Sequence, residues 1–527
     1  MTSTSETISV EQAVALLAEA AETGAARLAG SALDAAQEMA YDLAHVAARA
    51  EAARVMVGYG AHGRDEAELA AAFVADSLAD LATRVFGRET SWGLSAQFLD
   101  PARAFCARYR DAGFLATLAT KNFGRHLDDE FNLVQDTFRR FAEAELAPRA
   151  EHIHRTNADI PEEIIGKLAE IGAFGLSIPE NYGGFASGGE SDYLAMVIAT
   201  EELSRGSLAA GGSLITRPEI FARALVAGGT DEQRDYWLPR LASAQTLAAI
   251  AVTEPDFGSD VAGIRTTASR TDAGWVINGV KTWCTFAGRA DVLMLLARTN
   301  PDLSAGHRGL SVFVVEKEPT GGHSFRFTQP GGGVMEGRAI DTIGYRGMHS
   351  YEISFDRWVV PESALIGGES GMGRGFYLQM AGFENGRLQT AARAVGLMQA
   401  AYEAARGYAA NRKVFGQPIA DYQLTQVKLA RMVMLIQAAR QTSYAVAVMM
   451  AQGGGSAEAA MVKAFACRAA EWVTREAMQI HGGMGYAEEF PVSRYFVDAR
   501  VLSIFEGADE TLCLKVISRQ LTSRVRS

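Results

Sequence analysis

Glu506 is the residue of this chain whose surroundings most clearly suggest chemistry. It follows an apolar run and precedes a glycine in residues 502–510, LSIFEGADE. An apolar wall disfavours the charged form of a carboxylate and raises its pKa, which suits a base that removes a proton from carbon. An apolar segment ending in Glu-Gly is also typical of a surface turn, so the motif alone leaves both interpretations open.

A second segment, TEPDFGSD at residues 253–260, could bind a ligand after the apolar run LAAIAV. Gly258 allows the backbone to turn and to approach a ligand closely, and Thr253 and Ser259 supply hydroxyl groups. The alternative is a helix-capping turn in which Ser259 and Asp260 are the caps.

A third segment, KTWCTFAG at residues 281–288, places an indole close to a hydroxyl group. Side chains alternate with a period of two along a strand, so we expect Trp283 and Thr285 on the same side. The hydroxyl can hydrogen-bond to a ring nitrogen of a flat heteroaromatic ligand while the indole packs on the ring. The alternative is an ordinary aromatic side chain buried in a sheet.

Two further segments have features that suit phosphate groups. Residues 411–423, NRKVFGQPIADYQ, place Arg412 and Lys413 before a Gly/Pro turn. The planar guanidinium can bind two oxygens of a pyrophosphate, although a solvated helix end would look the same. Residues 479–486, QIHGGMGY, form a glycine-rich break that permits close approach of phosphate or another chain. It is not a G-x-G-x-x-G turn after a strand, and His481 reads as an ordinary loop histidine.

Composition limits the class of protein. The 527 residues are 48% hydrophobic and 21% charged, which predicts about three or four domains. The net charge of −12 argues against nonspecific nucleic-acid binding but leaves room for a local cationic pocket. No uninterrupted apolar stretch reaches about 18 residues, so we expect no membrane span.

Cysteine usage and the N-terminus predict a cytoplasmic protein. The N-terminal MTSTSETISVEQAV lacks the basic and apolar regions of a signal peptide. No CxxC pair occurs, which argues against a disulfide framework or a zinc site and fits a reducing compartment. We therefore expect no metal in this protein. The four scattered cysteines are Cys106, Cys284, Cys467 and Cys513.

Hydrophobic spacing predicts an α+β protein that is mostly α. Helical periodicity covers residues 10–248, then alternating Thr, Val and Gly residues predict short antiparallel strands, and the chain becomes helical again near residue 371. The GGGS at 453–456 is expected to join two helices. The predicted parts are an N-terminal helical extension (1–125), a helical domain (126–248), an antiparallel β-domain (249–368) and a C-terminal four-helix bundle (369–527).

Taken in order, these segments resemble the acyl-CoA dehydrogenase family over roughly residues 126–527. The shared elements are TEPxxGSD, W-x-T, the GYRG at 344–347, R-x-x-FG with a downstream Gln, Q-x-x-GG-x-GY and EGxxE. Each element is weak alone, but their joint occurrence is specific. The first 125 residues lie outside the usual body of this family.

The resemblance implies an FAD-dependent α,β-dehydrogenation of an acyl-CoA thioester. Glu506 would remove the α-proton, its backbone N–H would help to hold the thioester oxygen, and Gly507 would line the thioester. Thr285 would bond near flavin N5 and Trp283 would pack on the ring. The remaining FAD residues would be Val252, Thr253, Gly258 and Ser259 beside the ring, Arg412, Gln423, Gln479, Gly482 and Gly483 at the diphosphate and adenosine, and Ala508 and Glu510 in the EGxxE element. Ser259 would also contact CoA, and Arg387 would lie on the substrate side.

Two positions differ within the family pattern. Some members place the base one residue before the arginine of FENGR; here that residue is Gly386, which favours Glu506 as the base. The threonine usual after Glu-Gly is Ala508, so one hydroxyl contact to FAD is missing.

Arg217 is the candidate for substrate selection. It lies in a largely apolar stretch, SLITRPEI at 213–220, and a partly buried guanidinium requires an anion. That anion could be Glu219 or another acidic residue, or a carboxylate of the substrate. Several segments and the long extension resemble a member that converts (2S)-methylsuccinyl-CoA to mesaconyl-CoA in the ethylmalonyl-CoA pathway. Arg217, and secondly Arg387, would offset the second carboxylate of this substrate.

The resemblance also implies partners. We expect an electron-transfer flavoprotein as acceptor and a homodimer at least, with the extension covering a surface that a second dimer would otherwise occupy. The alternatives are a dehydrogenase for short or branched monocarboxylyl-CoA, an acyl-CoA oxidase, and a non-enzymatic scaffold. Retention of Glu506, Thr285, Trp283 and Arg412 argues against a scaffold.

Overall fold

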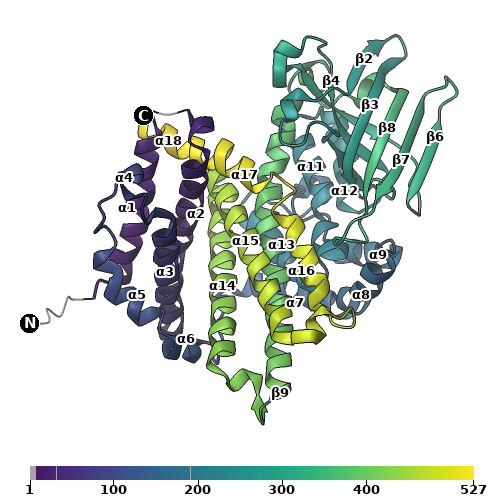
Figure 1. Ribbon diagram of the computed structural model, residues 1–527. Coiled ribbons are helices and arrows are strands. Elements are labelled where there is room, and N and C mark those ends of the chain that lie inside the picture. The colour runs from purple at the N-terminus through teal and green to yellow at the C-terminus, as the bar shows by residue number, and fades with distance from the viewer. Residues whose placement is uncertain (1–6, 31, 190, 527) are drawn as a thin grey trace, which may run out of the picture. The chain divides into compact units, whose positions relative to one another are not determined.

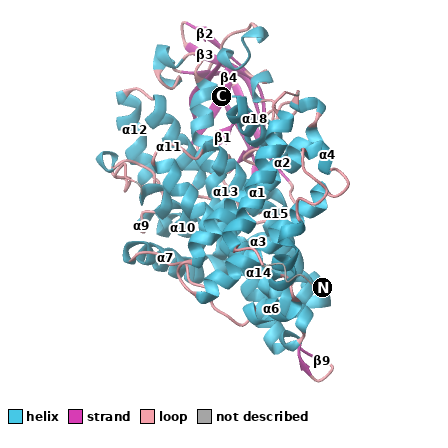
Figure 2. Ribbon diagram, turned by 90° about the vertical axis from the view of Figure 1, so that its left-hand side faces the viewer, coloured by secondary structure: helices cyan, strands magenta, loops and turns pink. Residues whose placement is uncertain are grey.

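The computed structural model describes residues 7–30, 32–189 and 191–526. The chain divides into two units, Met1–Leu133 with Thr390–Ser527, and Val134–Gln389. Helices make up most of the first unit, and the strands gather in one sheet of the second unit apart from the short β9–β10 pair (Figure 1, Figure 2). The mostly helical α+β class predicted from the sequence is confirmed.

The first unit is built from helices of both chain ends. They are α1 (Val10–Leu28), α2 (Gln37–Gly60), α3 (Arg64–Val85), α4 (Glu89–Trp92), α5 (Arg103–Tyr109), α6 (Ala112–Leu118), α14 (Gln423–Ala451), α15 (Ser456–His481), α16 (Val492–Leu502), α17 (Asp509–Thr511) and α18 (Ser518–Arg526). Helix α2 packs against α3, α14 and α15, so N-terminal and C-terminal helices share one core. The helical character of the N-terminal extension and the GGGS connection between α14 and α15 are as predicted.

Small residues let the N-terminal helices pack closely. Ser9 caps α1 and forms a reciprocal capping box with Gln12. A Cβ added at Gly24 would lie 3.0 Å from the ring of Trp92, which is fully buried. Glycine at this position therefore allows α1 to approach the indole, and the indole fills the space between helices.

The second unit contains six helices and a mixed sheet, and one long helix continues out of it. The helices are α7 (Asp129–Phe141), which begins just before the unit, α8 (Ala147–Thr156), α9 (Glu162–Glu170), α10 (Ser191–Gly206), α11 (Thr216–Gly228) and α12 (Asp231–Ala242). Helix α13 (Gly375–Asn411) contributes residues to both units. After it, β9 (Lys413–Val414) and β10 (Gln417–Pro418) form a hairpin.

The sheet follows the order β1-β4-β2-β3-β8-β7-β6, with β5 paired to β4. Its strands are β1 (Ala248–Ala251), β2 (Thr267–Thr271), β3 (Gly274–Thr285), β4 (Val292–Arg298), β5 (Leu310–Glu316), β6 (Ser324–Thr328), β7 (Val334–Ile340) and β8 (Ser350–Val360). Most pairs are antiparallel, as predicted, including the β2–β3 hairpin. The exceptions are β1–β4 and a single β2–β4 pair, which are parallel.

Helix α11 and strands β1, β4 and β5 supply the hydrophobic core of this unit. Phe221, Ile250, Met294 and Val312 are buried in one cluster. Strand β4 is buried along its whole length, which explains its unbroken apolar sequence VLMLLA. The core therefore fixes the end of β1, from which the TEPDFGSD segment leaves.

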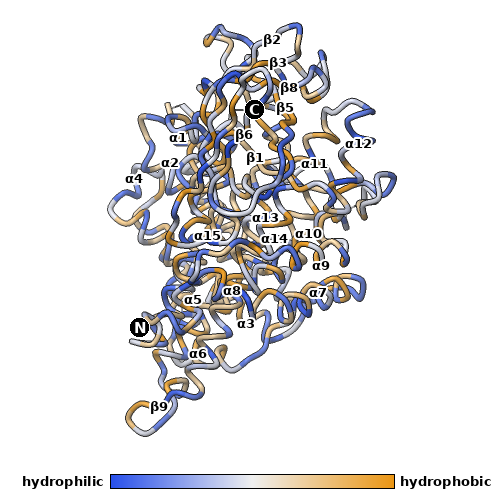
Figure 3. The backbone as a smooth tube through the Cα atoms, turned by 90° about the vertical axis from the view of Figure 1, so that its right-hand side faces the viewer, coloured by the Kyte–Doolittle hydropathy of each residue, from blue (hydrophilic) through white to orange (hydrophobic). Residues whose placement is uncertain are grey.

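Hydrophobic and hydrophilic residues are mixed along the helices (Figure 3). Among the residues that the structure describes, no helix combines the length and the apolar character needed to cross a membrane.

Candidate active site

Glu506 lies in a tight loop between α16 and α17, which we call the catalytic loop (residues 503–509). Helix α16 ends as the N–H groups of Ile504 and Phe505 both donate to Val501 O, at 2.9 and 3.1 Å. Glu506 then adopts a left-handed conformation with φ 54°. The N–H of Asp509 donates to Ser503 O at 3.0 Å and closes the loop. A non-glycine residue with positive φ is uncommon and is often found where function demands a fixed side-chain direction.

The apolar wall expected before Glu506 is only partly present within its own unit. Leu502 is fully buried, whereas the side chain of Ile504 is 55% exposed. The guanidinium of Arg393 lies 4.7 Å from the ring centroid of Phe505, a cation–π contact that fixes the residue before Glu506. The segment is a half-buried turn whose neighbours are held from within the unit, so the surface-turn alternative stays open.

A buried lysine holds the residue after Glu506. Lys463, on α15, donates to Gly507 O at 2.6 Å and is 1% exposed. A Cβ at Gly507 would lie 2.9 Å from Leu512 Cδ2, and its φ is 95°, so both space and conformation require glycine. Lys463 was not among the predicted site residues. A single lysine in the apolar run AAMVKAFACRAA was the signal that could have identified it.

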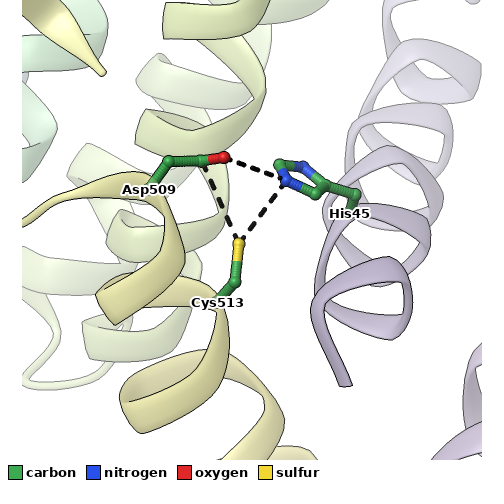
Figure 4. A group of neighbouring side chains, drawn as sticks. All are labelled: His45, Asp509 and Cys513. Atoms are coloured by element: carbon green, nitrogen blue, oxygen red, sulfur yellow. Dashed lines mark hydrogen bonds and ion pairs between the residues drawn. The ribbon is translucent and has the colours of Figure 1, made fainter. Parts of the chain in front are cut away.

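The N-terminal extension holds the other end of the catalytic loop (Figure 4). Asp509 Oδ2 accepts a hydrogen bond from Tyr41 Oη at 2.5 Å and lies 3.2 Å from His45 Nε2. The Cys513 thiol lies 3.6 Å from His45 Nε2 and 3.9 Å from Asp509 Oδ1. Burial opposes ionisation of Asp509, but the hydrogen bonds from His45 and Tyr41 hold its pKa below the usual range. The extension therefore contacts the catalytic loop three residues after Glu506.

In the second unit, the TEPDFGSD loop is organised by Glu254. Its carboxylate accepts hydrogen bonds from the N–H groups of Arg265 (2.7 Å) and Thr266 (2.8 Å) and from Lys281 Nζ (2.9 Å). Lys281 also donates to Val252 O at 2.8 Å. Burial lowers the pKa of Lys281 to about 8 even though Glu254 opposes the shift. The sequence analysis assigned no role to Glu254 or Lys281, which together fix this loop to β3.

The rest of this loop is open. Gly258 and Ser259 are exposed, and a Cβ at Gly258 would meet no atom within 4 Å. Nothing in the chain itself therefore requires glycine at this position. The helix-capping alternative is not supported at Asp260, which precedes a short 3₁₀ turn without a side-chain capping hydrogen bond.

Trp283 and Thr285 do not alternate as an uninterrupted strand would. Trp283 has φ 57° and the β3–β8 register shifts between Lys281 and Cys284, which marks a bulge. Its indole is 55% exposed, whereas Thr285 is buried and its hydroxyl lies 3.0 Å from Ser350 Oγ. The prediction of strict alternation is wrong here, because the bulge redirects Trp283. The alternative of a buried aromatic is wrong for the same reason.

The candidate phosphate residues lie on exposed backbone of the first unit. Arg412 follows the end of α13 and Gln423 begins α14, with the β9–β10 hairpin between them. Gln479, Gly482 and Gly483 surround His481, which is buried and stacks on Tyr408 with ring centroids 4.3 Å apart. A Cβ at Gly482 or Gly483 would meet no atom within 4 Å. Like Gly258, these glycines leave space beside the chain.

Arg217 is buried on α11, and its Nη2 lies 3.4 Å from Tyr345 Oη in the GYRG segment. Glu219, the nearby carboxylate considered as its partner, is bonded by Asn385 and by Gln389 at 2.5 Å and pairs with Arg223 at 3.4 Å. Burial raises the pKa of Glu219. Asn385 belongs to the FENGR segment of α13, which also carries Gly386 and the half-buried Arg387.

Family models match three consecutive parts of the chain. They are the acyl-CoA dehydrogenase N-terminal domain (residues 128–245), middle domain (249–358) and C-terminal domain (373–521). An acyl-CoA dehydrogenase of Bacillus subtilis is 37% identical over 75% of this chain and 99% of its own length. The chain belongs to the acyl-CoA dehydrogenase family. It is therefore an oxidoreductase of a family of flavoproteins.

Other similar proteins are named for particular acyl-CoA substrates. The (2S)-methylsuccinyl-CoA dehydrogenase of Cereibacter sphaeroides is 44% identical over 77% of this chain and 73% of its own length. A structure of glutaryl-coenzyme A dehydrogenase with glutaryl-CoA has a TM-score of 0.68 at 32% identity, over 76% of this chain and 96% of that chain. Butyryl-CoA dehydrogenase from Megasphaera elsdenii has the same TM-score at 30% identity, over 76% and 100%. The family models leave residues 1–127 of this chain unmatched.

Proposed function

We propose that this protein is an FAD-dependent acyl-CoA dehydrogenase in which Glu506 is the base. The observation that supports this most directly is the catalytic loop: Glu506 has a left-handed backbone, and Gly507 and Asp509 are bonded by Lys463, Tyr41 and His45. Such support on both sides of a carboxylate limits its movement, which proton transfer at carbon requires.

Each of these residues would have a separate role in the reaction. Glu506 would take the α-proton of the thioester, and the electrons of that C–H bond would become part of the new α,β double bond. The N–H of Glu506 would donate to the thioester oxygen, where negative charge develops. Gly507 would keep the space beside the thioester free. FAD, when bound, supplies the acceptor for the hydride that leaves the β-carbon.

The residues present fit FAD. The exposed indole of Trp283 offers a flat face for the isoalloxazine, and Gly258 leaves room for the ring system beside the loop. Val252, Thr253, Ser259 and Thr285 would complete this part of the site. Arg412, Gln423, Gln479, Gly482 and Gly483 would bind the diphosphate and adenosine, with Ala508 and Glu510 near the flavin. The guanidinium of Arg412 suits a diphosphate because its planar fork pairs with two oxygens.

We further propose a homodimer in which these FAD contacts cross the subunit boundary. Two hydrophobic side chains beside the candidate phosphate residues favour an interface, since Phe415 at the tip of the β9–β10 hairpin is 95% exposed and Leu424 is 69% exposed. The extension would take the place of a second dimer. An electron-transfer flavoprotein would receive the electrons in the cytoplasm.

The proposed substrate is (2S)-methylsuccinyl-CoA, converted to mesaconyl-CoA in the ethylmalonyl-CoA pathway. The 44% identity with the Cereibacter sphaeroides protein supports it. A buried guanidinium at Arg217 would pair with the free carboxylate of this substrate, with Arg387 as the second candidate. The carboxylate would otherwise be repelled by Glu506.

The test is turnover of the purified FAD-loaded protein with an artificial electron acceptor. We expect the highest kcat/KM with (2S)-methylsuccinyl-CoA in comparison with butyryl-CoA, isovaleryl-CoA and glutaryl-CoA. Preference for a monocarboxylyl-CoA would keep the reaction and overturn the substrate. Rapid reoxidation of the reduced flavin by O2 would identify an oxidase, and purified protein without any flavin would overturn the proposal itself.

Arg217→Ala provides a separate test of the carboxylate contact. We expect kcat/KM for methylsuccinyl-CoA to fall about 10- to 100-fold or more, because loss of a buried charge partner costs several kcal/mol. The loss with butyryl-CoA should be much smaller. Arg223→Gln, which changes a neighbouring guanidinium that pairs with Glu219, is the matched control. Equal losses with both substrates would reject the contact.

A further inference from the structure

Three potential metal ligands from distant parts of the second unit converge beside the sheet. Asp159 lies between α8 and α9, His323 directly precedes β6, and His349 directly precedes β8. One ligand atom from each lies within 4.8 Å of the other two. His349 Nε2 is 3.0 Å from Asp159 Oδ1, and the two imidazole centroids are 4.3 Å apart at an interplanar angle of 54°.

The outer atoms of two of these side chains are already oriented by backbone groups. The His349 ring also hydrogen-bonds to the backbone of Ala158, and Asp159 Oδ2 accepts from the N–H of Gly322 at 3.0 Å. A metal-binding histidine usually donates its second ring nitrogen to a carbonyl or carboxylate, and a ligating carboxylate is itself hydrogen-bonded. Both arrangements are present here, with Nε2 of His349 and Oδ1 of Asp159 directed toward each other.

The ligand set suits zinc. Two imidazoles and one carboxylate supply N and O donors, which bind Zn²⁺ at about 2.0–2.2 Å in a roughly tetrahedral arrangement. In such an arrangement neighbouring donors are about 3.3 Å apart, close to the observed His349–Asp159 distance. Asp159 and His323 are exposed, whereas His349 is 7% exposed. An ion can therefore enter from solvent, and a water can complete its coordination.

The first unit offers a useful contrast in His45, Asp509 and Cys513 (Figure 4). All three are buried, and Asp509 already accepts from Tyr41. Burial, reinforced by the charge of Asp509, raises the pKa of the Cys513 thiol, which opposes formation of the thiolate that a metal needs. Its donors are bonded to one another and are largely buried, so we assign it a structural role.

We propose that Asp159, His323 and His349 form a Zn²⁺ site that ties the α8–α9 connection to the beginnings of β6 and β8. This site is independent of the residues assigned to FAD and CoA. The site lies at the start of β8, where Ser350, the residue after His349, pairs with Thr285 of β3. A bound ion would fix the start of β8 and so keep the Thr285–Ser350 contact in place.

The test is Zn²⁺ titration of the FAD-loaded protein after removal of metals with a chelator, followed by calorimetry. We expect one ion per chain and a rise in the thermal midpoint. His323→Gln should weaken binding on the order of tenfold or more, since even partners of metal ligands contribute 10- to 100-fold. His323 is exposed, so this variant should fold. The matched control is His307→Gln, a half-buried histidine of the same unit that contacts Tyr377.

Co²⁺ separates this site from the cysteine cluster. Cobalt bound by Asp159, His323 and His349 should give visible d–d bands without a thiolate charge-transfer band, and these bands should persist in Cys513→Ser. They should be lost in His323→Gln and in Asp159→Asn. Absence of Zn²⁺ binding by the wild type, equal binding by His323→Gln, or a thiolate band that disappears in Cys513→Ser would each overturn the proposal.

Discussion

Glu506 and Glu254 are both carboxylates in short loops, but the chain supports them in different ways. Both oxygens of Glu254 are bonded by backbone N–H groups and by buried Lys281, and its pKa is low because Lys281 and these N–H groups outweigh the effect of burial. Around Glu506 the supports act on its neighbours, through Lys463 at Gly507 and through Tyr41 and His45 at Asp509.

We propose that the difference separates a structural carboxylate from a catalytic base. A carboxylate saturated with hydrogen bonds is a weak base and a good loop anchor, which describes Glu254. A base must be held in place and still be able to accept a proton, so its backbone is fixed while the support comes from adjacent residues. Changes at the two loops should therefore separate activity from stability.

The largest effect is expected from Glu506→Gln. The amide is close in size but cannot take the α-proton, so kcat should fall about 10²- to 10⁴-fold. FAD content and the thermal midpoint should be unchanged, because the supports of the loop lie on other residues. Stopped-flow measurement of flavin reduction at 450 nm checks this. A loss in rate of only about tenfold would show that Glu506 is not the base.

Lys281→Met should show the opposite behaviour. It leaves the carboxylate of Glu254 buried without its cation, which costs about 3–5 kcal/mol of unfolding free energy. The double variant Glu254→Gln with Lys281→Met removes both charges and should recover part of that loss. Denaturant unfolding of both variants measures this. If Lys281→Met is as stable as the wild type, the Glu254–Lys281 pair does not hold the TEPDFGSD loop.

Much of the architecture could be predicted from the sequence, because it depends on local periodicity. Helices α2 and α3, strands β3, β5 and β8 and the helical connection at GGGS follow from apolar spacing and turn residues. Specific motifs also indicated Glu506 and the TEPDFGSD loop as candidate site residues, and these assignments stay predictions. The bulge at Trp283 could not be predicted, since it arises from pairing with β8 rather than from the residues of β3 alone.

Contacts between distant residues were the other limit. Tyr41 and Asp509 are 468 residues apart, and no local pattern joins them. The same holds for Asp159, His323 and His349, which lie far apart in the sequence. No metal was expected because the cysteines are scattered and form no CxxC pair. Single lysines in apolar segments were the signal that could have revealed these supports. Lys281 and Lys463 both lie in such segments, where an amine needs a buried partner.

Tyr41→Phe tests whether the extension supports the catalytic loop. It removes a hydrogen bond to a charged carboxylate, which contributes about 1.5–3 kcal/mol to stability. We expect a lower unfolding midpoint together with a several-fold lower kcat, since Asp509 closes the loop that carries Glu506. The control is Lys515→Gln, which removes an exposed contact to Asp34 between the same two parts of the chain. If the two variants behave alike, Asp509 is an ordinary packing contact.

The smallest expected effect is a pH dependence of the unfolding free energy that arises from His45 and Asp509. Burial lowers the pKa of His45, so the unfolded chain takes up the proton more readily and the unfolding free energy should fall as pH drops below about 6.5. Asp509 adds a second loss below about pH 4, because hydrogen bonds keep its pKa low in the folded state despite burial. Chemical denaturation between about pH 7 and 5 should show a smaller slope for His45→Gln than for the wild type. An identical slope would mean that His45 takes up its proton without disturbing the loop, and that the extension acts through Tyr41 alone.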